Sequence, residues 1–200
     1  MSLTVSAGRE ARFEPVEEGT HLGVCRMVVD LGVQRSDLFQ SQSRKVLIGW
    51  ELPGLLVETE DGPRPRSISR QYTASLGENA NLRQELAAWR GRDFSPEELE
   101  NFDLRKIVGT SCLVNVEHRT ANGKTCAVVR NVLPLPKGMA GGVLRERPVV
   151  YDMDRDPPGA VEALPRWVAE LVKRSADWPP QAAAAPAFTE LPDDGGPLPF

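Results

Sequence analysis

Residues 110–133 read TSCLVNVEHRTANGKTCAVVRNVL and decide the fold class of this chain. Apolar and polar side chains alternate on both sides of Ala121-Asn-Gly-Lys124. Asn-Gly between two alternating segments is the strongest short-range signal for a two-residue β-hairpin. The sequence therefore predicts two antiparallel strands, over 110–119 and 125–133, joined by a tight turn.

Three more strands are expected before this hairpin. Branched and aromatic residues, which favour extended backbone, are concentrated in residues 20–34, 43–52 and 67–76. Pro53-Gly54 is expected to stop the second of these strands, because this dipeptide favours a turn. Five strands in all are therefore predicted.

The pattern between the third and fourth strands is helical. Leu82, Leu86 and Trp89 recur at the spacing of one helical face. Ser95-Pro-Glu-Glu98 is a capping-box pattern with proline at the first helical position, so a second short helix should start there. A further short helix is expected over 165–174, after the last strand.

Five strands with helices between the third and fourth follow the order of an OB-fold, although another small barrel could share this order. We expect a mainly β protein: a five-stranded OB-like β-barrel with one or two helices between strands 3 and 4, a C-terminal helix and a disordered acidic tail. The expected parts are a flexible arm (1–19), the barrel (20–137), an irregular extension with a short helix (138–178), and a Pro/Ala linker with an acidic tip (179–200).

Length, hydrophobicity and charge limit the classes of protein to which this chain can belong. The chain has 200 residues, 40% of them hydrophobic, which suits one sizeable core with appendages. It has no run of 18 apolar residues, and Met1–Pro15 lacks the regions of a signal peptide, so we expect a cytoplasmic protein that does not enter a membrane. The net charge is −4, yet residues 1–174 carry 24 basic and 24 acidic side chains, so the excess negative charge lies in 175–200.

No motif for nucleotide binding, nucleophilic catalysis or metal ligation occurs. We therefore expect neither an enzyme nor a cofactor or metal site. Cys25, Cys112 and Cys126 lie far apart in apolar segments and are expected to be small buried side chains. His21 and His118 belong to no catalytic pattern.

Nucleic-acid binding is the function for which candidate residues exist, because cations neutralise phosphates and aromatic rings stack on bases. Arg70 and Tyr72 alternate onto one face of the third strand, which suits a single-strand groove, although Tyr72 could equally lie half in the core. Trp50 shares its face with aliphatic residues, which favours a core position over a stacking one. The candidate DNA-binding residues are Arg44, Lys45, Trp50, Arg70, Tyr72, Lys124 and Arg130, with Phe39 as a weaker stacking candidate.

The stretch Tyr72 to His118, YTASLGENANLRQELAAWRGRDFSPEELENFDLRKIVGTSCLVNVEH, resembles a group of bacteriophage early proteins identified as single-stranded DNA-binding proteins of the OB type. KVLIGWELP (45–53), NGKTCAVVRNVLPLPKG (122–138) and LPRWVAELVKRSADW (164–178) share the resemblance. It implies a cytoplasmic protein of the infected bacterial host that binds single-stranded DNA, with little sequence preference, during phage replication or recombination.

The tail carries a separate resemblance, to the acidic C-terminal tip of bacterial single-stranded DNA-binding proteins. Asp193, Asp194, Pro199 and Phe200 match that tip, although residues 195–198 separate the acids from Pro-Phe in this chain. The resemblance implies that these four residues recruit host or phage replication and repair proteins.

Two further readings stay open. The chain could be an interaction module of phage replication or recombination that binds no DNA itself, which the neutral charge of residues 1–174 slightly favours. A homodimer is also possible, through exposed barrel edges or through the helix expected at 165–174.

Overall fold

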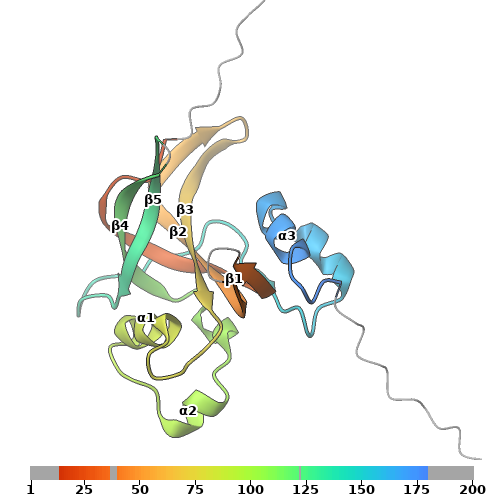
Figure 1. The fold of residues 1–200 in the computed structure, drawn as a ribbon. Coiled ribbons are helices and arrows are strands. Elements are labelled where there is room, and N and C mark those ends of the chain that lie inside the picture. Colours follow the sequence, from red (N-terminus) through yellow and green to blue (C-terminus); the bar gives the residue numbers. More distant parts are fainter. Residues whose placement is uncertain (1–13, 37–39, 122, 180–200) are drawn as a thin grey trace, which may run out of the picture.

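The computed structural model describes residues 14–36, 40–121 and 123–179. The chain is mainly β and forms a nearly closed five-stranded antiparallel barrel with OB-like topology, as predicted (Figure 1). The ladders follow the order β3-β2-β1-β4-β5, and β3 and β5 approach each other to close the barrel. The strands are β1 (Gly19–Ser36), β2 (Ser41–Thr59), β3 (Gly62–Thr73), β4 (Ser111–Ala121) and β5 (Lys124–Leu133).

The predicted β4–β5 hairpin is confirmed. Its ladder runs from the pair Leu113–Leu133 to the pair Ala121–Lys124. Gly123 has a φ of 73°, a left-handed conformation that glycine adopts without steric cost. The local Asn-Gly signal therefore sets the register of this hairpin.

The expected end of the second strand at Pro53-Gly54 is wrong. β2 continues to Thr59 and pairs with β3 from Gly62 onward. The register shifts between Leu52 and Leu56, so residues 53–55 form a bulge without partners on β3. Pro53 is tolerated there because a bulged residue does not have to donate a backbone hydrogen bond to the neighbouring strand. The bulge thus lets the β2–β3 hairpin extend beyond the barrel.

Helix α1 (Asn81–Arg90) covers one end of the barrel (Figure 1). Its buried residues are Leu82, Leu86 and Trp89, the predicted apolar face, and Gly91 ends the helix with a φ of 68°. Because these side chains belong to the same cluster as the barrel interior, the helix closes the core at this end.

The predicted capping box is also present. Ser95 Oγ accepts a hydrogen bond from the Glu98 backbone N–H (3.3 Å), and the Glu98 carboxylate accepts one from the Ser95 backbone N–H (3.0 Å). These bonds begin the short helix α2 (Pro96–Glu100), which is followed by a 3-10 turn, η1 (Leu104–Ile107).

The chain after the barrel is more regular than expected. It contains β6 (Val149–Tyr151), the 3-10 helix η2 (Pro158–Ala163) and helix α3 (Arg166–Lys173). We call residues 149–178 the C-terminal extension. β6 pairs in parallel with β1, and α3 lies beside β1 (Figure 1). None of the helices in the described segments has the length and hydropathy needed to cross a bilayer.

A second hydrophobic cluster joins this extension to the outer face of the barrel. Val168 and Val172 of α3 are fully buried and share the cluster with Leu31 and Leu47. The apolar face of α3 is therefore occupied within the chain. Residues 46–52 of β2 are consequently buried on both faces of the strand, which is why Leu47 is as inaccessible as its neighbour Ile48.

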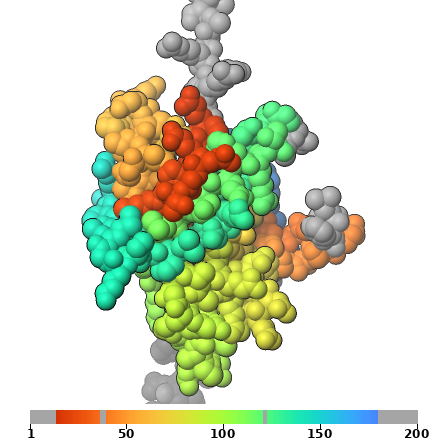
Figure 2. Space-filling model, turned by 90° about the vertical axis from the view of Figure 1, so that its left-hand side faces the viewer, coloured from red at the N-terminus to blue at the C-terminus, as the bar shows by residue number. Residues whose placement is uncertain are grey.

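The end of the predicted flexible arm is held against the barrel. Arg66 Nη1 donates to the Glu14 carbonyl oxygen (2.6 Å), and His118 Nε2 lies 2.7 Å from the Val16 carbonyl oxygen. In Figure 2 this first described segment, in red, lies between the β2–β3 hairpin in orange and the β4–β5 hairpin in green. Residues 1–13 lie outside the described part of the chain.

Candidate nucleic-acid interface

A groove lies on the barrel surface where β3 approaches β5. Two pockets with volumes of about 450 and 380 Å³ form it, and Ser69, Ala127 and Trp167 line both of them. Four arginines line these pockets, and no aspartate or glutamate does so among the described residues. We call this site the arginine groove; its cations are Arg26, Arg70, Arg119 and Arg130.

Small side chains leave the space for this groove. Gly49, Ser67, Ser69 and Ala127 lie along it. A Cβ atom added at Gly49 would stand 3.1 Å from the Cβ of Met27, which is tighter than ordinary packing. Larger residues on β2 and β3 would therefore fill the groove.

Two of the arginines reach the groove because each is the extra residue of a β-bulge. Arg26 lies between Cys25 and Met27, where the β1–β2 register shifts. Arg130 is skipped in the β4–β5 ladder, in which its two neighbours Val129 and Asn131 are both paired. A bulge turns the side chain of its extra residue out of the regular alternation.

The alternation expected for the fifth strand is consequently wrong at Val132, beyond the bulge. It placed Arg130 on one face with Cys126, Val128 and Val132. In the structure Val132 is fully buried in the barrel, whereas the Arg130 side chain is 65% exposed. Cys126, expected to be buried, is exposed and lines the groove, while Cys25 and Cys112 are buried as predicted.

Arg70 bridges the two strands on either side of the groove. Its Nη1 donates to the Arg130 carbonyl oxygen (2.9 Å) and forms an ion pair with Glu85 of α1 (3.2 Å). Its guanidinium also lies 5.1 Å from the ring centre of Tyr72. Burial raises the pKa of Glu85, and the charge of Arg70 opposes that rise. Arg70 therefore both lines the groove and holds β3 to β5.

The other three arginines differ in how strongly they are engaged. Arg26 forms an ion pair with Glu146 (2.8 Å) and donates to the Arg147 carbonyl oxygen (3.1 Å). Arg130 forms a single exposed ion pair, with Glu117 of β4. Arg119 has no ion pair or side-chain hydrogen bond to any residue in the described part of the chain. Arg119 and Arg130 are therefore the cations most available to a ligand.

Among the described residues that line the groove, Trp167 is the one aromatic side chain with a substantial exposed surface. It is 48% exposed, although its neighbour Val168 in α3 is fully buried. It was absent from the predicted site, yet the sequence held a signal: Trp167 lies off the apolar face of the helix predicted at 165–174.

The predicted cations are spread over several parts of the surface. Arg70 and Arg130 line the groove, as described above. Lys124 is exposed in the β4–β5 hairpin but does not line the groove. Lys45 donates from Nζ to Thr73 Oγ1 (2.8 Å). Arg44 lies in a different pocket, between two aspartates.

Both candidate stacking residues of the barrel are core residues, as the sequence pattern favoured for Trp50 and left open for Tyr72. Trp50 has no exposed surface and Tyr72 is 3% exposed, so neither ring offers a face to a base. Trp50 packs instead on Trp89 of α1, with ring centres 6.1 Å apart. Burial also raises the pKa of Tyr72. Phe39 lies outside the described residues, as do the four tip residues, Asp193, Asp194, Pro199 and Phe200.

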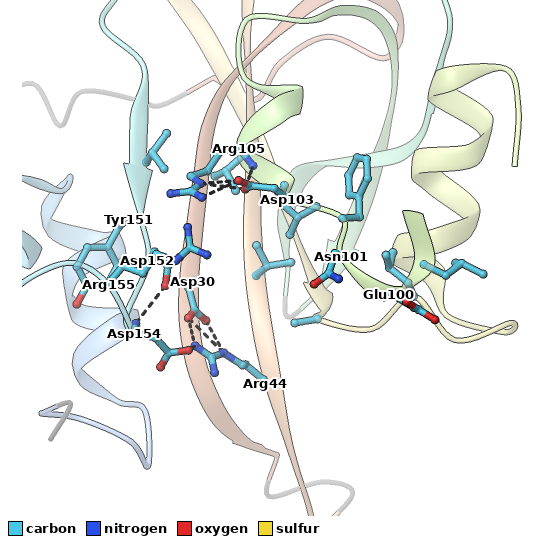
Figure 3. Close-up of a pocket in the computed structure, with 18 residues that line it drawn as sticks. Asp30, Arg44, Glu100, Asn101, Asp103, Arg105, Tyr151, Asp152, Asp154 and Arg155 are labelled. Atoms are coloured by element: carbon cyan, nitrogen blue, oxygen red, sulfur yellow. Dashed lines mark hydrogen bonds and ion pairs between the residues drawn. The ribbon is translucent and has the colours of Figure 1, made fainter. Parts of the chain in front are cut away.

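The pocket that contains Arg44 has a volume of about 480 Å³ and lies between β1, β2, η1 and β6 (Figure 3). We call it the aspartate pocket. The carboxylates of Asp30, Asp152 and Asp154 come within 4.8 Å of one another there. The Arg44 guanidinium donates to both Asp30 and Asp154, so it already occupies the place between two of these carboxylates.

No protein-family model and no curated protein sequence matches this chain. The chemistry of the groove and of the barrel that carries it is therefore the basis for assigning a function.

Proposed function

We propose that this protein binds single-stranded DNA along the arginine groove, with little sequence preference. The observation that carries the proposal is the lining of the groove, in which the described residues include four arginines and no acid, in a chain of net charge −4. A local concentration of cations of this kind is the electrostatic footprint of a phosphate backbone. Guanidinium groups also match phosphate oxygens in geometry.

The position of the groove supports the same function. OB-folds bind oligonucleotides on the face of strands 2 and 3, near the loop between strands 4 and 5. The arginine groove contains residues of β2, β3 and β5, next to the β4–β5 hairpin. Arg26 of β1, Arg119 of β4 and Trp167 of α3 complete its lining. Its pockets have the size of small-ligand sites, so the base of an unpaired nucleotide can enter them. The bases of a duplex are paired with one another and are not free to do so.

The low sequence preference follows from the donors that the groove presents. Contacts from arginine to phosphate fix position and contribute affinity but carry no information on the base. Within the resemblance to phage proteins, such binding suits DNA replication or recombination. Recruitment of partner proteins by Asp193, Asp194, Pro199 and Phe200 stays a prediction beside this proposal.

The proposal is tested by placing one negative charge in the acid-free groove. Ser69 lines both pockets, so Ser69→Glu should repel phosphate there and lower the affinity for a fluorescein-labelled oligo-dT about tenfold at low salt. Fluorescence anisotropy measures this affinity, and high salt should weaken binding by the wild-type protein.

Ser69→Gln is the matched control, because it adds nearly the same volume without a charge. We expect its affinity to stay within about twofold of wild type, with both variants unfolding at a similar temperature. Equal losses in the two variants would point to steric blockage alone. A wild-type protein that shows no salt-sensitive binding would refute the proposal and leave the interaction module as the function.

A further inference from the structure

The extension outside the barrel provides the groove with its exposed aromatic surface. Of the tryptophans, Trp50 and Trp89 are buried in the core of the barrel, and Trp178 packs against the second cluster. Trp167 differs from them, because nearly half of its surface is exposed and it lines both pockets of the groove. A base that enters the groove therefore meets a side chain of α3.

We infer that the C-terminal extension supplies the base-stacking platform, Trp167, and that this platform makes the arginine groove selective for single strands over duplexes. The inference rests on the proposed function, because stacking on Trp167 requires that nucleic acid enters the groove. It assigns the platform to a helix that packs on the barrel, instead of to the barrel strands.

The arrangement of the cations around Trp167 supports this role. Arg26 lines one of the two pockets that Trp167 lines, and Arg70, Arg119 and Arg130 line the other. Trp167 is common to both pockets. A nucleotide stacked on this ring thus has cations nearby for its adjoining phosphates.

The platform is held in place before any ligand binds. Val168, Ala169 and Val172 of α3 are buried in the second cluster. The chain after α3 is bonded to β1, since Ala176 N donates to the Val33 carbonyl oxygen (2.9 Å) and the Val33 N–H donates to Asp177 (3.1 Å). A helix fixed along its buried face and just beyond its end loses little freedom when a ligand stacks on it.

Stacking and phosphate contacts make different demands on the ligand. Arginine–phosphate contacts form with single strands, with duplexes and with a backbone that lacks bases. Stacking on an indole requires an unpaired base. Trp167 should therefore add affinity only for a ligand that combines a backbone with accessible bases.

The test compares three labelled ligands of equal length: oligo-dT, the same oligomer with abasic residues, and a duplex. We expect Trp167→Ala to weaken oligo-dT about tenfold and to change the other two affinities little, with an unchanged dependence on salt. Trp167→Phe should restore most of the loss, because it keeps an aromatic face. Oligo-dT should also protect Trp167 fluorescence from iodide quenching in the wild-type protein.

Arg119→Ala is the matched variant for the phosphate contribution, and it should weaken all three ligands and lower the salt dependence. If Arg119→Ala behaves in this way while Trp167→Ala weakens oligo-dT and the abasic oligomer equally, or neither, the platform is refuted and the groove stands. If the wild-type protein binds no oligo-dT, the proposed function fails together with this inference.

Discussion

The arginine groove and the aspartate pocket contain the same kind of cation in opposite surroundings. Four arginines line the groove, and no acid does so among the described residues. Three of these arginines each pair with one glutamate outside the lining. Three arginines and five carboxylates line the aspartate pocket, in which Arg44 lies beside Asp30 and Arg105 beside Asp103 (Figure 3). Those carboxylates belong to Asp30, Glu100, Asp103, Asp152 and Asp154.

The comparison shows that availability, and not the number of arginines, distinguishes a phosphate site. Arg44 is bonded to Asp30 and Asp154, and chiefly through Asp30 its pKa is raised above the usual range. The bonds to these carboxylates engage Nε and Nη2 of Arg44. The same carboxylates repel a phosphate that approaches the remaining donors. Arg119, with no such partner in the described part of the chain, can accept a phosphate without losing an existing bond.

The largest effect should come from removing the two most available cations of the groove. The double variant Arg119→Ala/Arg130→Ala should weaken oligo-dT binding by about 3 kcal/mol, or about 100-fold, because each charged hydrogen bond contributes about 1.5 kcal/mol. The slope of log affinity against log salt should fall in magnitude by about 1.4. Anisotropy titrations at several salt concentrations measure both quantities.

Stability is the control for this double variant. Arg130 loses only an exposed ion pair, and its backbone carbonyl still accepts from Arg70. The free energy of unfolding should therefore change by no more than about 1 kcal/mol. If the folded double variant bound oligo-dT as tightly as wild type, the available arginines of the groove would not be a phosphate site, and the proposed difference from the aspartate pocket would be wrong.

The fold was predictable because its signals are local. Asn-Gly at the β4–β5 turn, the spacing of Leu82, Leu86 and Trp89, and the Ser95–Glu98 capping box each depend on a few neighbouring residues. The long β2 strand was not predictable in this way, since a bulge after Leu52 absorbs a proline that favours a turn.

The candidate site was predictable only in part, because long-range contacts complete it. Arg70 and Arg130 were expected, but Arg26 lies among apolar residues and reaches the groove only through a bulge that nothing in the sequence marks. Trp50 shares a face with Val46 and Ile48, and that pattern correctly favoured the core. The position of Trp167 depends on the docking of α3, which involves residues more than a hundred positions apart.

A moderate effect on stability should follow from removing the paired arginine of the aspartate pocket. Arg44→Ala leaves Asp30 and Asp154 without their shared cation, next to Asp152. The loss should lower the free energy of unfolding by about 1–2 kcal/mol, less than for a fully buried pair, because the Arg44 side chain is 40% exposed. Denaturant unfolding measures the change. Arg64→Ala, which removes an exposed pair with Asp61, should change stability by less than about 0.5 kcal/mol.

Affinity for oligo-dT provides the second readout of Arg44→Ala. We expect it to stay within about twofold of wild type, because Arg44 does not line the groove. A loss comparable with that of Arg119→Ala/Arg130→Ala would mean that both regions bind DNA. The carboxylates of the aspartate pocket would then not prevent phosphate binding there.

The smallest effect concerns the protonation of one carboxyl group, that of Asp103, in the aspartate pocket. The Arg105 guanidinium lowers the pKa of Asp103 from its ordinary 3.8 to about 2. Because the folded-state pKa is depressed, this pair stabilises the fold above about pH 4, and the contribution is lost as the pH falls toward 2. Arg105→Ala should bring the pKa back toward 3.8, which carboxyl-carbon NMR titration of Asp103 measures. An Asp103 pKa that stays near 2 in this variant would show that other groups of the pocket set it, and that its charges act as a network and not as separate pairs.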